Sequence, residues 1–169
     1  KILMILYNYP PHQSIGTLRG IGFVKYLPKY GWRPIVITRD WKDEKYPHEE
    51  PEGVKVFRTE YNDILRFFRR GKRNTKRGEN SFDQHMTGIE IIKVRIKEKL
   101  SFLIKEILAY PDENIGWEKF AVQKAQEVIK KEKPDIIFSS SPTATSHIIA
   151  SKLKEEFNIP WVADFRDLW

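Results

Sequence analysis

Three short polar segments contain the residues of this sequence that are best suited to chemistry. They are residues 14–17 (SIGT), 139–141 (SSS) and 164–167 (DFRD), and each comes soon after an apolar run. A glycine lets backbone amides approach a ligand closely, and the N-terminus of a helix attracts anions. Serines offer hydroxyl groups, and a guanidinium beside carboxylates can bind a charged ligand. The three segments are therefore candidates for binding a polar or anionic ligand.

Each segment also has a purely structural explanation, which the sequence leaves open. The first could be a tight turn before a capped helix, and the second a helix start with small residues for close packing. Asp164 and Arg166 could form a structural salt bridge, and His147 could be a packed or solvent-facing histidine. The first segment is not a P-loop, because no Gly-Lys-Ser/Thr follows it, and its glycines lack the dinucleotide-binding spacing.

The sequence contains no pattern typical of a metal site or of a nucleophilic triad. Its four histidines are scattered, without the spacing of a ligand cluster, and residue order alone assigns no Ser-His-Asp arrangement. The absence of cysteine excludes disulfide bonds and thiolate chemistry. We expect no metal and no cofactor.

Apolar runs and helical periodicity predict the elements that carry these segments. Strands are expected at residues 2–7, 33–38, 54–59, 135–139 and 161–163, and helices at 17–30, 89–107, 117–129 and 144–157. Gly31 is expected to stop the first helix and Thr143 to cap the last one. This alternation predicts a Rossmann-like α/β fold, a doubly wound parallel sheet with flanking helices. Ligands bind at the carboxyl ends of such strands, where the three polar segments are expected.

Length and composition favour one ordinary domain over residues 1–169. Forty per cent of the residues are hydrophobic, which is enough for a core. No apolar run approaches the roughly 20 residues of a membrane span. The run at 2–7 is too short for a signal peptide. We expect a soluble or peripheral protein.

The net charge of +7 is concentrated in one region. Residues 58–77 contain eight basic residues against Glu60 and Asp63, and the segment at about 64–86 is expected to be mobile. Its mixture of phenylalanine and basic residues suits an anionic membrane surface. A nucleic-acid site and a plain solvated loop are the alternatives. The residues predicted to meet the membrane are Arg66, Phe67, Phe68, Arg69, Arg70, Lys72 and Arg73.

Three stretches together resemble the N-terminal domain of glycosyltransferase family 4, the retaining GT-B enzymes. They are residues 11–38, 110–147 and 159–169, so the resemblance covers most of the chain except about 40–108. It implies the acceptor-side half of a two-domain enzyme. A nucleotide-sugar would be the donor substrate, bound largely by a C-terminal domain absent from this chain. The acceptor would be a saccharide or a lipid-linked sugar, and no metal would be obligatory.

The resemblance also implies a setting and an activity. We expect an enzyme of cell-surface polysaccharide biosynthesis, cytoplasmic and peripheral on the inner face of the membrane. The isolated domain is expected to be inactive. The alternatives are a basic α/β nucleic-acid-binding module and the nucleotide-binding domain of another Rossmann-like enzyme. We expect no nucleic acid as a partner.

The resemblance further implies roles for individual residues. Many relatives have a His-Asp pair where this chain has Arg166-Asp167, and a guanidinium cannot act as a base near neutral pH. Arg166 is therefore expected to stabilise a phosphate leaving group, with Asp164 and Asp167 as the other catalytic candidates. The residues expected at the donor phosphates are Ser14, Gly16, Thr17 and Arg19, although the family's usual pair of glycines is Ile15-Gly16 here. Those expected at the acceptor are His12, Ser140, Ser141, Thr143 and His147.

Overall fold

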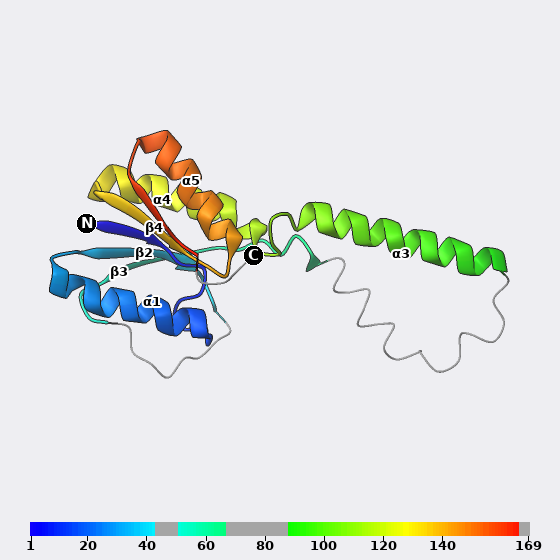
Figure 1. Ribbon diagram of the computed structural model, residues 1–169, viewed down its shortest axis with the longest axis horizontal. Helices are drawn as coiled ribbons and strands as arrows, with labels where there is room; N and C mark the ends of the chain where they lie inside the picture. Colours follow the sequence, from blue (N-terminus) through cyan, green and yellow to red (C-terminus); the bar gives the residue numbers. More distant parts are fainter. Residues whose placement is uncertain (43–50, 67–87, 166–169) are drawn as a thin grey trace. The chain divides into compact units, whose positions relative to one another are not determined.

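The structure is a computed structural model that describes residues 1–42, 51–66 and 88–165 (Figure 1). The chain divides into two compact units, one made of residues 1–62 and 116–169 and the other of residues 63–115. The membrane prediction for 67–73 and the catalytic prediction for Arg166 and Asp167 fall outside the described residues.

The first unit is built on a five-stranded sheet in which every pair of neighbouring strands is parallel. The strands are β1 (Ile2–Ile5), β2 (Pro34–Arg39), β3 (Lys55–Thr59), β4 (Ile136–Ser140) and β5 (Trp161–Asp164). Their order across the sheet is β3-β2-β1-β4-β5. The predicted Rossmann-like parallel α/β sheet is therefore confirmed.

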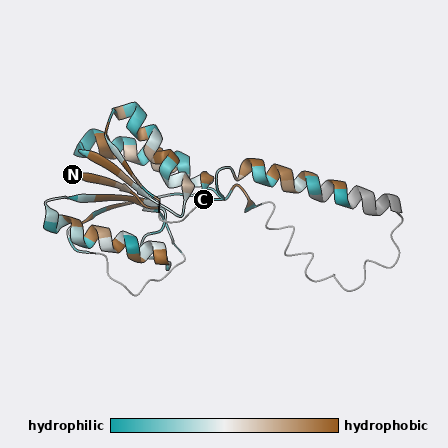
Figure 2. Ribbon diagram, viewed as in Figure 1, coloured by the Kyte–Doolittle hydropathy of each residue, from teal (hydrophilic) through white to brown (hydrophobic). Residues whose placement is uncertain are grey.

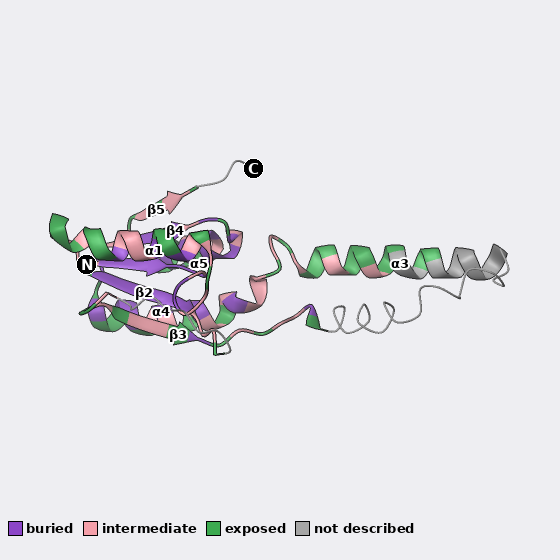
Figure 3. Ribbon diagram, turned by 90° about the horizontal axis from the view of Figure 1, so that it is seen from below, coloured by how far each residue is buried: buried purple, intermediate pink, exposed green. Residues whose placement is uncertain are grey.

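Helices cover both faces of this sheet, as Figure 1 shows. They are α1 (Ile15–Tyr26) on one face, and α4 (Glu118–Glu132) and α5 (Ala144–Phe157) on the other. Successive side chains of a strand point to opposite faces, so Leu3 and Ile5 pack with α4 and α5 while Met4 packs with α1. The continuous apolar sequence of β1 follows from this burial on both sides, which Figure 3 shows in purple.

The ends of the helices follow from particular residues. Ser14 has an extended backbone, and its Oγ accepts a hydrogen bond from the Thr17 amide at 3.2 Å, so α1 begins two residues earlier than predicted. A short 3-10 turn, η1 (Leu27–Tyr30), ends at Gly31, whose φ of 80° confirms the predicted stop. Thr143 occupies the N-cap position of α5 as expected, but its side chain makes no capping hydrogen bond.

The chain leaves the first unit after Asn62 and returns to it at Gly116, and the two ends meet. The Asn62 amide donates a hydrogen bond to the Gly116 carbonyl at 3.2 Å. Beside it, in the short helix η2 (Ile115–Trp117), the buried Trp117 indole donates to Thr59 Oγ1 at 2.7 Å. The exit and the return are therefore fixed to each other within the first unit.

The second unit contains one long helix, α3 (Gly88–Leu108), which confirms the helix expected at 89–107. Within α3, the structure describes the side chains of residues 95, 96 and 99–108. Figure 2 shows apolar and polar residues interspersed along this part of α3, and Figure 3 shows much of it as exposed. Within the described ranges, no helix is both long enough and apolar enough to cross a membrane.

Replacement of Leu3 by alanine tests the role of the central strand. Leu3 is fully buried, so we expect Leu3→Ala to lower the free energy of unfolding by about 2–5 kcal/mol, from lost burial and the cavity left behind. Val162 on the edge strand β5 is 47% exposed, and Val162→Ala should cost less than about 1 kcal/mol. Urea unfolding followed by far-UV circular dichroism measures both. Equal stability of the two variants would contradict this description of the core.

Candidate functional site

The strand order places a crevice at the carboxyl ends of β1 and β4. From β1 the sheet continues to β2 and β3 on one side, and from β4 to β5 on the other. The loops that follow β1 and β4 consequently diverge, and open α/β sheets bind ligands at such a point. A small, partly open pocket lies here. It is lined by Leu6, Tyr7, Asn8, Gly16, Ser140, Ser141, Pro142 and Thr143.

Gly16 allows the start of α1 to lie against the loop after β1. A Cβ atom at this position would lie 3.0 Å from Asn8 Nδ2 and 3.4 Å from Asn8 Cβ. Because Gly16 has no side chain, Asn8 can pack against it, and the backbone of Gly16 lines the pocket. Sequence reasoning gave Gly16 a ligand-binding role and did not identify Asn8, because nothing in the sequence marks which side chain approaches a glycine.

Asp164 is the polar centre of this edge of the sheet. Its carboxylate accepts two hydrogen bonds from Arg19, with Nε at 2.8 Å and Nη2 at 2.7 Å, and a third from Ser140 Oγ at 2.7 Å. The Asp164 carbonyl accepts two hydrogen bonds from Ser141, one from the backbone amide at 3.0 Å and one from Oγ at 3.2 Å. One residue at the end of β5 thus joins α1 to the loop after β4.

These contacts define what Asp164 can do chemically. The hydrogen bonds from Arg19, supported by Ser140, hold the pKa of Asp164 below its usual range. The same pairing raises the pKa of Arg19. Because both carboxylate oxygens already accept hydrogen bonds, Asp164 is suited to positioning its neighbours and poorly suited to accepting a proton. Arg19, predicted at a donor phosphate, is instead paired with Asp164 in this state.

His147 is buried within a directional chain of hydrogen bonds. The Trp161 indole can only donate, and it does so to Ser139 Oγ at 2.8 Å. Ser139 Oγ lies 2.8 Å from His147 Nδ1, to which it can donate its hydrogen. On the other side, His147 Nε2 lies 3.4 Å from Ser141 Oγ, which donates to the Asp164 carbonyl. A proton on Nε2, with Nδ1 as the acceptor, is the tautomer that uses every donor and acceptor of these contacts.

The surroundings of His147 favour the neutral ring. Burial lowers its pKa, and the nearby Asp164 charge opposes this only in part. The ring also packs against Phe165, with a distance of 4.5 Å between ring centroids. His147 was expected to contact an acceptor directly, but the structure places it behind the serines that line the pocket.

A cluster of aromatic rings surrounds Arg39, the last residue of β2. The sequence did not predict this cluster. The Arg39 guanidinium carbon lies 4.1 Å from the Trp41 ring centroid and 3.9 Å from that of Tyr61. Arg39 Nη1 donates to the Tyr7 hydroxyl at 2.6 Å. His12 stacks on Trp41, with 3.9 Å between centroids and 10° between planes. His12 therefore lies on the aromatic cluster and does not line the pocket beside Gly16.

The structure brings several of the site residues predicted from the sequence together. Gly16, Ser140, Ser141 and Thr143 share one pocket, and Asp164 contacts two of them. Ser14 and Thr17 bond to each other at the start of α1. Among the residues that the structure describes, no three histidine, aspartate or glutamate side chains are grouped to hold a metal ion.

No protein-family model matches the chain, and no curated protein matches it either.

Asp164→Asn tests the carboxylate pairing. The folded-state pKa of Asp164 is depressed, so its contribution to stability is present above the unfolded pKa of about 3.9 and is lost as the pH falls through the folded value. At pH 7 we expect Asp164→Asn to lower the free energy of unfolding by about 1 kcal/mol, a small value because Arg19 is 41% exposed. Urea unfolding should show the difference from wild type shrinking toward pH 2. A difference independent of pH would contradict the pairing.

His147→Gln tests the neutral histidine. Because burial depresses its folded-state pKa, an unfolded chain binds a proton more readily than the folded one below about pH 6.5. Wild-type stability should therefore fall more steeply than that of His147→Gln between about pH 6.5 and 5. Long-range ¹H–¹⁵N NMR spectra should show the Nε2–H tautomer at pH 7.5. Parallel stability profiles, or an Nδ1–H tautomer, would rule out this arrangement.

Proposed function

We propose that the chain is the acceptor-side domain of a retaining glycosyltransferase, which transfers a sugar from a nucleotide-sugar to a saccharide or lipid-linked acceptor. The observation that carries the proposal is the pocket at the β1–β4 crevice. Gly16 and the start of α1 lie on one side of it, and residues 140–143, which we call the serine loop, lie on the other. The resemblance of the sequence to the N-terminal domain of glycosyltransferase family 4 supports the same assignment.

The α1 side of the pocket suits the phosphates of a nucleotide-sugar. The first amides of a helix lack intrahelical partners and attract negative charge. Gly16 lets an incoming oxygen approach the backbone without meeting a side chain, and Asn8 adds an amide that can donate a hydrogen bond. In this proposal the phosphates bind between Gly16 and the serine loop.

The serine loop suits a sugar or an acceptor hydroxyl. Ser140 and Ser141 donate their hydroxyl hydrogens to Asp164, so their oxygens can accept hydrogen bonds from a sugar, and Thr143 supplies a further hydroxyl group. His147 fixes Ser141 from behind, and Asp164 fixes Ser140, so these hydroxyls are held in place before a ligand arrives. We assign Asp164 and His147 positioning roles. His12, stacked on Trp41, offers an aromatic surface for a saccharide ring at the edge of the site.

Catalysis in this proposal requires groups beyond those described. Arg166 keeps its proposed role at the leaving phosphate, and Asp167 stays a catalytic candidate. The donor nucleotide would be held largely by a second domain. The described residues contribute acceptor orientation and part of the phosphate site.

A comparison of two glycines in α1 tests the proposal. We expect millimolar UDP-, GDP- or ADP-sugars to shift the NMR amide signals of residues 14–17 and 140–143. Gly16→Ala should weaken this binding at least about fivefold, because the new Cβ would crowd Asn8 at 3.0 Å. Gly22→Ala is the matched control, because a Cβ there meets nothing within 4 Å. The same panel with saccharide acceptors should give no sugar transfer by this chain alone.

Two results would count against the proposal. If no nucleotide-sugar or pyrophosphate perturbs residues 14–17 or 140–143, the pocket is not a phosphate site. If the chain alone transfers sugar, the donor site is not on another domain.

A further inference from the structure

The apolar side of α3 is unusually exposed for a helix of this length. Ile96, Leu100, Leu103 and Ile107 are between 55% and 74% exposed. Their spacing of four, three and four residues places them on one face of the helix, and Ile104 and Leu108 widen that face. We call these six residues the α3 stripe. An exposed apolar face of this extent indicates an interaction surface.

Basic residues flank the α3 stripe. Arg95 precedes Ile96, Lys99 precedes Leu100, and both side chains are exposed. At 100° per residue, Arg95 and Lys99 lie along one edge of the stripe. The sequence of α3 contains five basic and three acidic residues, and residues 63–115 contain twelve basic and eight acidic ones. The exposed Glu106 lies on the same edge, which therefore carries two basic residues and one acidic residue.

We propose that α3 is an interfacial membrane-binding helix that lies on the surface of an anionic bilayer with the α3 stripe in the headgroup region. The 21 residues of α3 extend about 31 Å, which is long enough to cross a bilayer. Eight charged residues within that length exclude crossing and favour lying in the plane of the surface. Tyr110, which follows the helix and is 79% exposed, suits the same interface.

Charge selects an anionic bilayer over a second copy of the chain. The chain has a net charge of +7 and α3 has five basic against three acidic residues, so two copies meeting at the α3 stripe would repel each other. Anionic lipid headgroups complement this positive charge, and basic residues near such a surface strengthen binding. This inference extends beyond the proposed function, since it holds whether or not the first unit binds a sugar.

Vesicle co-sedimentation of the full chain tests the inference. We expect binding to vesicles of phosphatidylcholine with about 30% phosphatidylglycerol, and at least tenfold weaker binding to phosphatidylcholine alone. Binding should weaken further when sodium chloride is raised from about 0.1 to 0.5 M, because salt screens the basic residues. Vesicle binding needs no nucleotide-sugar, so its failure is separate from failure of the proposed function.

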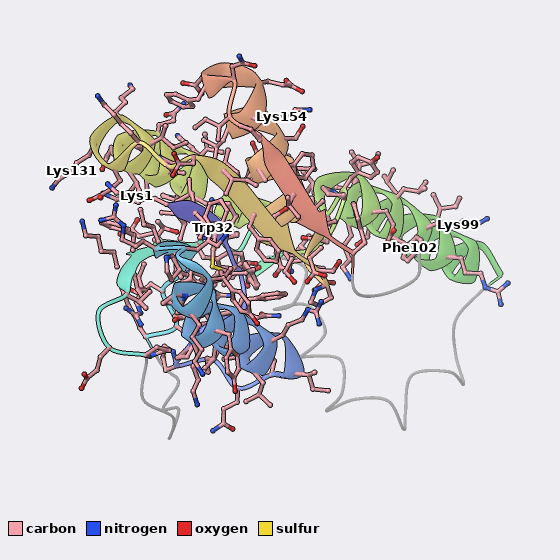
Figure 4. All side chains as sticks on the ribbon, turned by 60° about the vertical axis from the view of Figure 1, so that its left-hand side comes forward. Lys1, Trp32, Lys99, Phe102, Lys131 and Lys154 are labelled. Atoms are coloured by element: carbon pink, nitrogen blue, oxygen red, sulfur yellow. The ribbon has the colours of Figure 1, made fainter. Side chains whose placement is uncertain are left out.

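Matched substitutions on two faces of α3 test the role of the stripe. Leu103→Gln with Ile107→Gln should weaken binding to the anionic vesicles roughly tenfold or more, because two large apolar side chains leave the membrane. Glutamine keeps a high helix propensity. Phe102→Gln is the control, because Phe102 is 60% exposed but lies away from the stripe. It is labelled with Lys99 in Figure 4. This control should weaken binding less than about threefold.

Arg95→Gln with Lys99→Gln tests the basic residues beside the stripe. Binding to anionic vesicles should fall roughly tenfold, while the weak binding to neutral vesicles stays unchanged. Far-UV circular dichroism without lipid should be the same for all variants, because every replaced side chain is exposed.

Three results would overturn the inference. The first is equal binding of anionic vesicles by the wild type and Leu103→Gln/Ile107→Gln. The second is equal binding of anionic and neutral vesicles, or none. The third is a dimer in sedimentation velocity that Leu103→Gln/Ile107→Gln dissociates, which would make the stripe a contact between copies.

Discussion

The parallel pairing of β1 between β2 and β4 is the constraint on which the first unit depends. β1 is buried on both faces, so it must be apolar throughout, and it must lie at the centre of the sheet with helices on either side. The chain then extends the sheet in both directions from this strand. The crevice between the loops after β1 and β4 follows from that topology before any ligand-binding side chain is considered.

Polar contacts then give the crevice a defined geometry. Asp164 binds Arg19 of α1 and Ser140 at the end of β4, and His147 contacts Ser141, the next residue. Since buried polar groups are costly when unpaired, such a network favours one arrangement over its alternatives. The pocket serines are held by hydrogen bonds within the protein itself. This rigidity is what a binding site for a polar ligand requires.

The sequence predicted the sheet well, because short apolar runs that alternate with helices have few ways to bury both faces of each strand. It also identified the loops that meet, because parallel strands end at a common edge. The partners of individual residues could not be predicted. Arg19 and Asp164 are 145 positions apart, and the pairing depends on how α1 crosses the sheet. The Arg39 cluster was missed for a similar reason, since its aromatic residues come from different loops and share no spacing.

The hydrogen bond between Asn62 and Gly116 bears on how this chain could evolve. A segment whose two ends are already joined in the parent fold can change in length or content with little effect on that fold. Doubling the length of such an inserted segment adds only about 0.6 kcal/mol to the free-energy cost of closing the loop. The position between β3 and η2 is thus a natural point of insertion, at which related chains could acquire, exchange or lose a helix like α3 while inheriting the sheet unchanged.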